Sequence, residues 1–144
     1  MSQNVQTARQ RFVKRGNTLK SQRLTLALED GPLELELREV TAKRRTQLLK
    51  DCTTVNEDGD GGKVDQEKLV PAVLIACVYD AATGEPMFSE ADRDLINGMS
   101  AAFIDEVFAP AAALSGLTKE AQEQLKGNSD ATAAADSSSP SPAN

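Results

Sequence analysis

The chain contains no histidine and no tryptophan, and only 3% of its 144 residues are aromatic. Without histidine it lacks the side chain that most often acts as a general base near neutral pH, and no Ser-His or Cys-His arrangement can form. So few aromatic residues also argue against a platform on which the bases of single-stranded nucleic acid could stack. We therefore expect a protein that is not an enzyme and that requires no cofactor.

Cysteine is scarce as well, because the chain holds only Cys52 and Cys77. Small secreted domains usually carry more cysteines in pairs, so this number fits a reducing compartment. Cys77 lies in the most apolar segment and Cys52 near the end of a predicted helix, and both surroundings disfavour a reactive thiolate. There is also no apolar run of about eighteen residues and no signal-peptide pattern. We expect a soluble intracellular protein with no membrane partner.

The net charge of −6 is unevenly distributed along the chain. Residues 1–50 hold eleven Lys or Arg against five Asp or Glu, a net charge of +6, whereas residues 51–144 hold five against seventeen, a net charge of −12. No acidic residue precedes Glu29, so residues 1–22 form a basic arm, which we expect to be flexible. Such an arm suits nucleic acid or an acidic partner protein. The interpretation we favour is a solvated arm that rests on the acidic half of its own or a neighbouring subunit.

Two stretches of alternating leucines predict a β-hairpin over residues 23–38. The leucines alternate with polar residues on both sides of Asp30-Gly31-Pro32, which supplies the residue types of a turn. One face of this hairpin would be apolar and the other charged, and a lone hairpin is only marginally stable in water. Helices should therefore cover the leucine face.

Helix signals occupy most of the chain from residue 41 to residue 126. Thr41 is a suitable N-cap for a helix that ends near Asp51. The apolar stretch over residues 64–79 predicts a central helix that is buried on most sides and that Pro71 begins or kinks. We expect a single α+β domain over residues 23–126, mainly helical, with the hairpin packed on a small bundle of about four to five short helices.

Residues 78–117 carry many structural signals and no chemical ones. Ser89 begins a capping box with Asp92, and the short helix that follows should end at Gly98. Ser100 then caps a second, more apolar helix. A segment of this kind presents helical surfaces and does not hold a reacting group.

The second of these helices should end near Gly116 and should be bent or divided by Pro110. It carries an apolar stripe that either belongs to the core or contacts a partner, and the core is the more common role of such stripes. As a hypothesis, we take five residues as the partner-binding surface: Leu95, Phe103, Ile104, Val107 and Phe108.

Two segments should lack regular structure. The acidic loop over residues 53–63 is dense in Gly and Asp, which predicts a flexible, exposed connection. Residues 127–144 contain nothing apolar that is larger than Ala or Thr, so burial cannot offset the entropy lost on ordering, and we expect a disordered Ser/Ala/Pro tail.

Part of the acidic loop can be aligned with an EF-hand calcium loop over residues 56–67. The matching positions are Asn56, Asp58, Asp60, Gly61 and Glu67. The first position, however, lacks a full carboxylate, Lys63 replaces an aliphatic residue at the eighth, and Val64 stands at the ninth. We favour an acidic linker and expect no metal site.

The C-terminal half resembles the tail assembly chaperones of long-tailed bacteriophages. The resemblance rests on four segments in the order typical of that family: LVPAVLIACVYD, ATGEPMF with its G-x-P-x-F pattern, SEADRDLINGMS, and ALSGLTKEA with its closing S-G-L. The leucine hairpin and the helix after it suit the opening region of the family, so the resemblance covers about residues 23–126. The basic arm, the acidic loop and the tail lie outside it.

This resemblance implies a non-enzymatic role in the cytoplasm of the host bacterium. Such chaperones bind the tape measure protein, keep it soluble and help the tail tube protein polymerise around it, and many are also made in a longer, frameshifted form. The resemblance transfers no catalytic or metal-binding residue, and it implies absence from the mature virion. A homo-oligomer is compatible with this role.

Two alternatives come from other functional classes. The first is a structural tail completion or connector protein, which would be present in purified virions. The second is a small nucleic-acid-binding regulatory protein that uses the basic arm and whose affinity would fall steeply with salt. The acidic remainder of the chain and the lack of stacking aromatics speak against nucleic acid.

Overall fold

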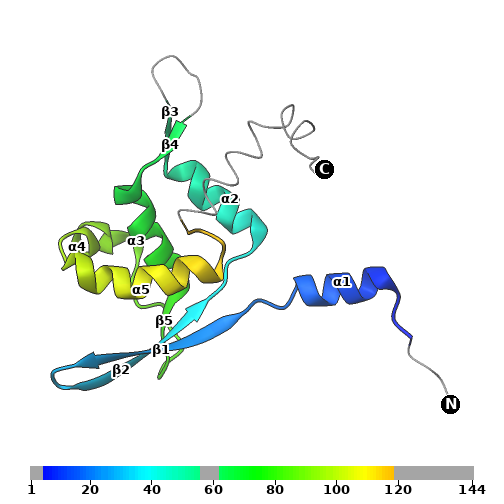
Figure 1. The fold of residues 1–144 in the computed structure, drawn as a ribbon, viewed down its shortest axis with the longest axis horizontal. Helices are drawn as coiled ribbons and strands as arrows, with labels where there is room; N and C mark the ends of the chain where they lie inside the picture. The colour runs from blue at the N-terminus through cyan, green and yellow to red at the C-terminus, as the bar shows by residue number, and fades with distance from the viewer. Residues whose placement is uncertain (1–4, 56–61, 119–144) are drawn as a thin grey trace, which may run out of the picture.

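The structure is a computed structural model that describes residues 5–55 and 62–118. A small antiparallel sheet lies beneath a layer of helices, and one further helix projects from the end of the sheet (Figure 1). This is the α+β, mainly helical fold with an N-terminal hairpin that the sequence predicts. The described α-helices are α1 (Ala8–Gly16), α2 (Ala42–Asp51), α3 (Gln66–Cys77), α4 (Arg93–Asn97) and α5 (Ala101–Leu114).

The leucine hairpin forms as predicted, from β1 (Ser21–Leu28) and β2 (Gly31–Arg38). Its register places Leu24 opposite Leu35, so that the leucines share one face. That face turns towards α5, and Leu37 is completely buried. The covering of the leucine face by helices is therefore confirmed.

A third strand, β5 (Val78–Asp80), pairs with β2 and gives the strand order β1-β2-β5. The prediction of a helix through Tyr79 is wrong at this end, because α3 stops at Cys77. Val78 is β-branched and its apolar side chain is buried whether the backbone is helical or extended, so apolar periodicity could not locate the boundary. The backbone pairing of Val78–Asp80 with β2 sets the end of the helix.

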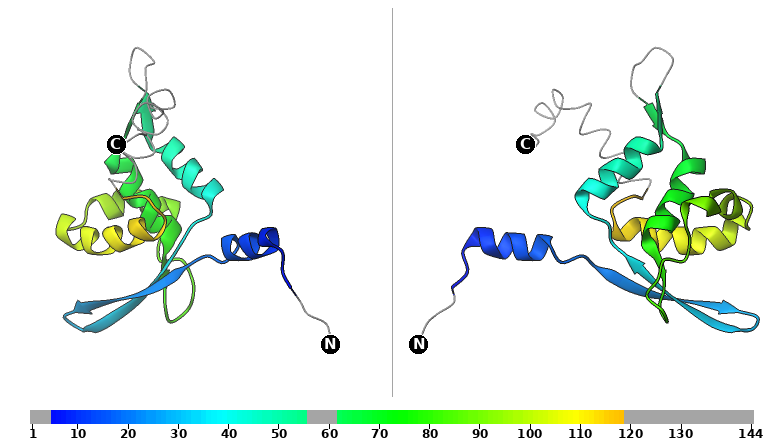
Figure 2. Two further views of the ribbon diagram at one scale, coloured as in Figure 1. Left: turned by 45° about the vertical axis from the view of Figure 1, so that its right-hand side comes forward. Right: turned by 180° about the vertical axis from the view of Figure 1, so that it is seen from behind.

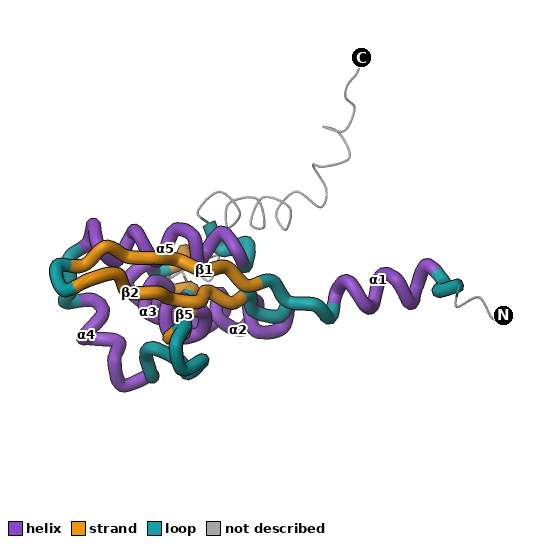
Figure 3. Tube along the Cα trace, turned by 90° about the horizontal axis from the view of Figure 1, so that it is seen from below, coloured by secondary structure: helices purple, strands orange, loops and turns teal. Residues whose placement is uncertain are grey.

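The core lies between the sheet and the helical layer. In Figure 3 the strands run beneath the helices along most of the length of the hairpin. The fully buried side chains come from both layers and form one hydrophobic core among the described residues. The largest are Leu37, Leu69, Leu74, Ile96 and Leu117.

Pro71 lies inside α3 and does not begin it. A proline has no backbone N–H, so it leaves unpaired the carbonyl oxygen four residues earlier, which belongs to Glu67. The Nδ2 atom of Asn97 donates a hydrogen bond of 3.1 Å to that oxygen. The end of α4 thus replaces the bond that Pro71 removes from α3.

The predicted caps of the last helices are present. Ser89 and Asp92 form a capping box before the 3-10 helix η1 (Glu90–Asp92), and α4 ends at Gly98. The Ser100 hydroxyl accepts a hydrogen bond from the Phe103 N–H and begins α5. Each helix therefore starts or stops where its own sequence provides the bonding group.

Pro110 does not divide α5, which continues without a break to Leu114. The helix closes as predicted at Gly116, whose φ is +71°. The Leu117 N–H donates to the carbonyl oxygen of Ala112 and the Gly116 N–H to that of Ala113, which together form a Schellman motif. The side chain of Leu117 is completely buried beside this turn.

The acidic loop is better ordered at its ends than predicted. The strands β3 (Thr53–Val55) and β4 (Gly62–Val64) pair as a small antiparallel ladder. The expectation of an unstructured loop over residues 53–63 is therefore wrong at both ends. The backbone pairing outweighs the local preference of Gly62, while Thr53 and Thr54 favour an extended backbone. Residues 56–61 between the strands lie outside the described residues, as do residues 119–126 and the predicted tail.

Candidate interaction surface

The structure does not bring the five candidate partner-binding residues onto one exposed surface. Ile104 is 8% exposed and Val107 is 5% exposed, and both belong to the core. The periodicity that suggested an interface is thus the buried face of α5, which packs on α3 and β2. For these two residues the core alternative is the correct one.

The two phenylalanines of the candidate set flank that buried face. Phe103 and Phe108 are half-buried and pack against the core. Five residues on an α-helix correspond to a rotation of about 140°, so the two rings lie on opposite sides of the stripe. Each is therefore only partly accessible to a partner.

Leu95 is the member of the set that the structure exposes. It lies on α4, and 58% of its surface is accessible. Its neighbours Asp94 and Ile96 divide the short helix into an outer, charged side and a buried side, because Ile96 is only 1% exposed. A partner helix could cover Leu95 without any rearrangement of the core.

The surroundings of Leu95 are strongly acidic. Residues 90–106, which we call the acidic end, hold five carboxylates and a single cation, Arg93. The Arg93 Nε atom lies 2.8 Å from a carboxylate oxygen of Glu90, and its Nη1 atom donates to the Lys68 carbonyl oxygen. The cation is therefore engaged within its own subunit. The carboxylates of this end are Glu90, Asp92, Asp94, Asp105 and Glu106.

The N-terminal arm is the second exposed feature, and it is the reverse of the acidic end in charge. α1 is helical over Ala8–Gly16, and Thr7 closes a capping box with Gln10. No residue of α1 is buried, and Phe12 is 80% exposed. Figure 2 shows α1 standing away from the rest of the protein in two further views. Its cations are Arg9, Arg11, Lys14 and Arg15.

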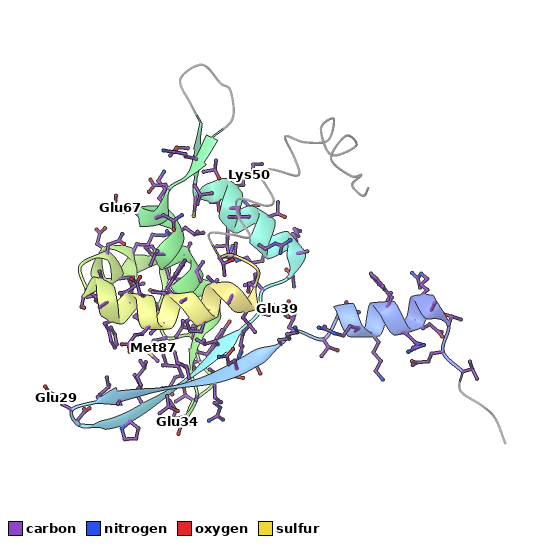
Figure 4. The ribbon with its side chains drawn as sticks, in the orientation of Figure 1. Glu29, Glu34, Glu39, Lys50, Glu67 and Met87 are labelled. Atoms are coloured by element: carbon purple, nitrogen blue, oxygen red, sulfur yellow. The ribbon has the colours of Figure 1, made fainter. Side chains whose placement is uncertain are left out.

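The root of the arm is fixed to the sheet. The Lys20 N–H donates to a carboxylate oxygen of Glu39 at 2.8 Å, and the Glu39 N–H donates back to the Lys20 carbonyl oxygen at 2.9 Å. Figure 4 shows Glu39 at this end of the hairpin and Glu29 at the opposite tip. The arm therefore leaves the sheet at the end opposite the turn.

A shallow groove of about 520 Å³ lies beside the root of the arm. Ile75, Ala76 and Tyr79 form part of its apolar lining. Its cation Arg38 stacks over the Tyr79 ring at 3.8 Å and pairs with Glu36 at 3.0 Å. These contacts already occupy the Arg38 guanidinium, and Lys20, Arg44 and Glu39 are the other charged residues that line the groove.

The two cysteines are poor nucleophiles in this fold. Burial raises the pKa of the Cys77 thiol to about 11, and a hydrogen bond with Ser115 offsets only part of this shift. Burial also raises the pKa of Cys52. Both thiols are free and protonated near neutral pH, as the sequence predicts.

The described residues contain no group of three acidic or cysteine side chains placed to hold a metal ion. Of the calcium-loop candidates, Glu67 lies in the first turn of α3. Asn56, Asp58, Asp60 and Gly61 lie outside the described part of the chain. Among the helices that are described, none has the length and hydrophobicity needed to cross a bilayer.

No protein-family model, curated protein or solved structure matches this chain. The function must therefore be argued from its own residues.

Proposed function

We propose that this protein is a non-enzymatic tail assembly chaperone of a long-tailed bacteriophage. In the host cytoplasm it would bind the tape measure protein, keep it soluble and promote polymerisation of the tail tube protein around it. One observation carries the proposal: four segments characteristic of that family follow one another in the family's order between residues 69 and 121.

In the fold, the described parts of these segments belong to elements that follow one another along the chain. They comprise α3 with β5, the turn that returns to Phe88, the capped helices η1 and α4, and the Schellman closure of α5. Their buried residues build the helical layer, so the resemblance lies mostly in the framework. Partner contacts would fall on the side chains that this framework exposes, foremost Leu95.

The physical chemistry of the role is compatible with such a small surface. A tape measure segment that awaits its tube exposes apolar helical stripes, and a helix carrying an exposed leucine can cover part of one. A single contact of this size is weak. Many copies along one rod would bind together through multivalency and would still be displaced one by one by tube subunits.

Co-expression with a tape measure protein tests the proposal. We expect Leu95→Glu to leave the chaperone folded but to reduce the soluble fraction of the tape measure protein severalfold. Leu28→Glu is the matched control, because Leu28 is also an exposed leucine, 38% accessible, at the hairpin tip. Ile104→Glu should instead unfold the protein, since it places a charge in the core.

The test has clear contrary outcomes. If the tape measure protein is equally soluble with and without this chain, the chaperone proposal fails. If Leu28→Glu impairs solubilisation and Leu95→Glu does not, the role stands but the surface is wrong. Detection of the chain in purified virions by mass spectrometry would favour a structural tail completion or connector protein.

The exposed basic helix α1 favours one other function, that of a small nucleic-acid-binding regulatory protein. The fold sharpens its test, because β1 begins at Ser21 and the arm can be removed as residues 1–19 without touching the sheet. Binding to DNA or RNA that falls steeply with salt and disappears with this truncation would support it. An intact ability to solubilise the tape measure protein after truncation would support the chaperone.

A further inference from the structure

The arm is built as a helix but contacts no core. α1 has only nine residues, and isolated helices of this length are marginal in water. Yet the Thr7 capping box bonds the free N–H groups of its first turn. Lys14 and Arg15 lie in its last turn, where their positive charges interact favourably with the helix dipole. Such local specification without burial suggests a helix completed by contact with another surface.

The exposed side chains of the arm define what that surface must be. Phe12 is 80% exposed and Val13 is 40% exposed, so an apolar contact is required. The helix has four cations and no acidic residue, so the surface must also be acidic. Within the described residues, Arg9, Arg11 and Lys14 take part in no ion pair.

The acidic end has the complementary properties. It exposes an apolar side chain, Leu95, among carboxylates. Asp94, Asp105 and Glu106 are exposed and, in the part of the chain that the structure describes, form no ion pair. The unpaired cations of α1 and the unpaired carboxylates of the acidic end are therefore opposite in charge. Each set of charges also lies beside an exposed apolar side chain.

These two surfaces lie at opposite ends of the subunit. α1 leaves the sheet at one end of the hairpin, whereas α4 and the start of α5 lie towards the other end, above the hairpin turn (Figures 1 and 3). The arm points away from its own acidic end. A contact between the two is therefore most directly made between different subunits.

We propose that two copies of this chain associate by exchanging arms, so that α1 of each copy docks on the acidic end of the other. A two-fold arrangement makes both contacts at once and closes the assembly as a dimer. Phe12 and Val13 pack over Leu95 of the second copy, and the arm cations face Asp94, Asp105 and Glu106. The arm and a tape measure segment would compete for Leu95, so the association of two copies is tested in the absence of the tape measure protein.

A second copy fits this arm better than nucleic acid does. The whole chain carries a net charge of −6, which repels a phosphate backbone. A phosphate backbone also leaves Phe12 uncovered, whereas the acidic end provides Leu95. Both the apolar and the charged parts of the arm therefore find a partner in the chain itself.

Sedimentation velocity of the full chain at tens of micromolar tests the association. We expect a dimer at low ionic strength that weakens as salt is raised, because the contact is largely electrostatic. Arg9→Glu with Arg11→Glu should weaken it at least about tenfold, and Asp105→Arg with Glu106→Arg should do the same. Lys43→Glu with Lys50→Glu on the exposed side of α2 is the matched control and should leave the dimer unchanged.

Mixing the two charge-reversed proteins gives the decisive result. In the mixture, the arm whose Arg9 and Arg11 are replaced by Glu meets the end whose Asp105 and Glu106 are replaced by Arg, which restores opposite charges at the exchanged positions. The remaining arm and end keep their original charges. We expect dimers in the mixture although each variant alone is monomeric. Circular dichroism of each variant verifies that it is folded.

Three results would overturn arm exchange. The first is a wild-type chain that stays monomeric at all salt concentrations. The second is a dimer that both reversals leave intact, and the third is a mixture that remains monomeric. Association that appears only when DNA or RNA is added would assign the arm to nucleic acid instead.

Discussion

The helical body and the N-terminal arm of this protein are both well capped, but only the body is packed. In the body, each of the described α-helices α2 to α5 contributes at least one buried residue, whereas α1 contributes none. Caps fix where a helix starts and stops, and burial supplies most of its stability. The comparison teaches that local sequence signals can specify a helix whose packing partner lies outside the subunit.

The largest expected effect concerns the packed side of this comparison. Leu69 is completely buried in α3, so Leu69→Ala should lower the free energy of unfolding by about 2–5 kcal/mol. Leu95→Ala removes the same atoms from an exposed position and should cost less than about 1 kcal/mol. Urea denaturation followed by circular dichroism measures both. Equal costs would mean that Leu95 is buried in solution.

A second effect, of the order of 2 kcal/mol, comes from the buried thiol of Cys77. Its pKa is raised from 9.0 to about 11 in the folded protein. The unfolded chain therefore loses this proton at a lower pH than the folded chain, and stability should fall as the pH rises from about 9 to about 11.

Denaturation at several pH values, compared with Cys77→Ala, isolates this contribution, because other groups titrate equally in both proteins. A difference between the two proteins that does not change with pH would contradict it.

The closing turn of α5 should show a smaller effect. Gly116 has a φ of +71°, a conformation that costs an L-amino acid about 1–2 kcal/mol, so Gly116→Ala should destabilise the body by this amount. The added Cβ would also lie 2.9 Å from Arg45 Nη1, the flexible end of a side chain that can move. Gly98→Ala is the control, because Gly98 has a φ of −89° and should tolerate alanine. Thermal denaturation distinguishes the two.

The smallest expected effect tests the arm directly. Thr7→Ala removes the capping box of α1, yet the free energy of unfolding should change by less than about 0.5 kcal/mol because α1 is unpacked in the monomer. Thr41→Ala removes the corresponding cap from α2 and should cost about 1 kcal/mol. Both are measured at low concentration and high salt. If Thr7→Ala lowers the free energy of unfolding as much as Thr41→Ala does, then α1 packs against its own subunit in solution.

The elements that could be predicted from the sequence are those defined by local chemistry. The leucine alternation of the hairpin, the caps Thr41, Ser89 and Ser100, and the glycine at position 116 each specify backbone geometry within a few residues. The strands β3 and β4 could not be predicted, because each consists of three residues that become strands only through pairing. The turn residues 80–85 suggest that Val78 and Tyr79 pair with Met87 and Phe88, but the pairing of β5 with β2 could not be predicted.

The candidate surface was harder to predict for a related reason. A helical stripe of Ile104, Val107 and their neighbours looks the same whether it faces a core or a partner. Only the placement of α5 on α3 and β2 decides between them. Leu95 and Phe12 are exposed because no other described element covers them. The periodicity of the sequence does not encode this tertiary arrangement.

One hydrogen bond in the fold joins residues far apart in the sequence. The Val40 N–H, just after the hairpin, donates to the Ser115 hydroxyl at 3.0 Å, across a separation of 75 residues. The leucines of β2 therefore have no cover until α5 has left the ribosome, and loop closure over this distance is slow compared with hairpin formation. During synthesis the nascent hairpin is an exposed apolar strand pair, so the protein is itself open to aggregation until α5 is made.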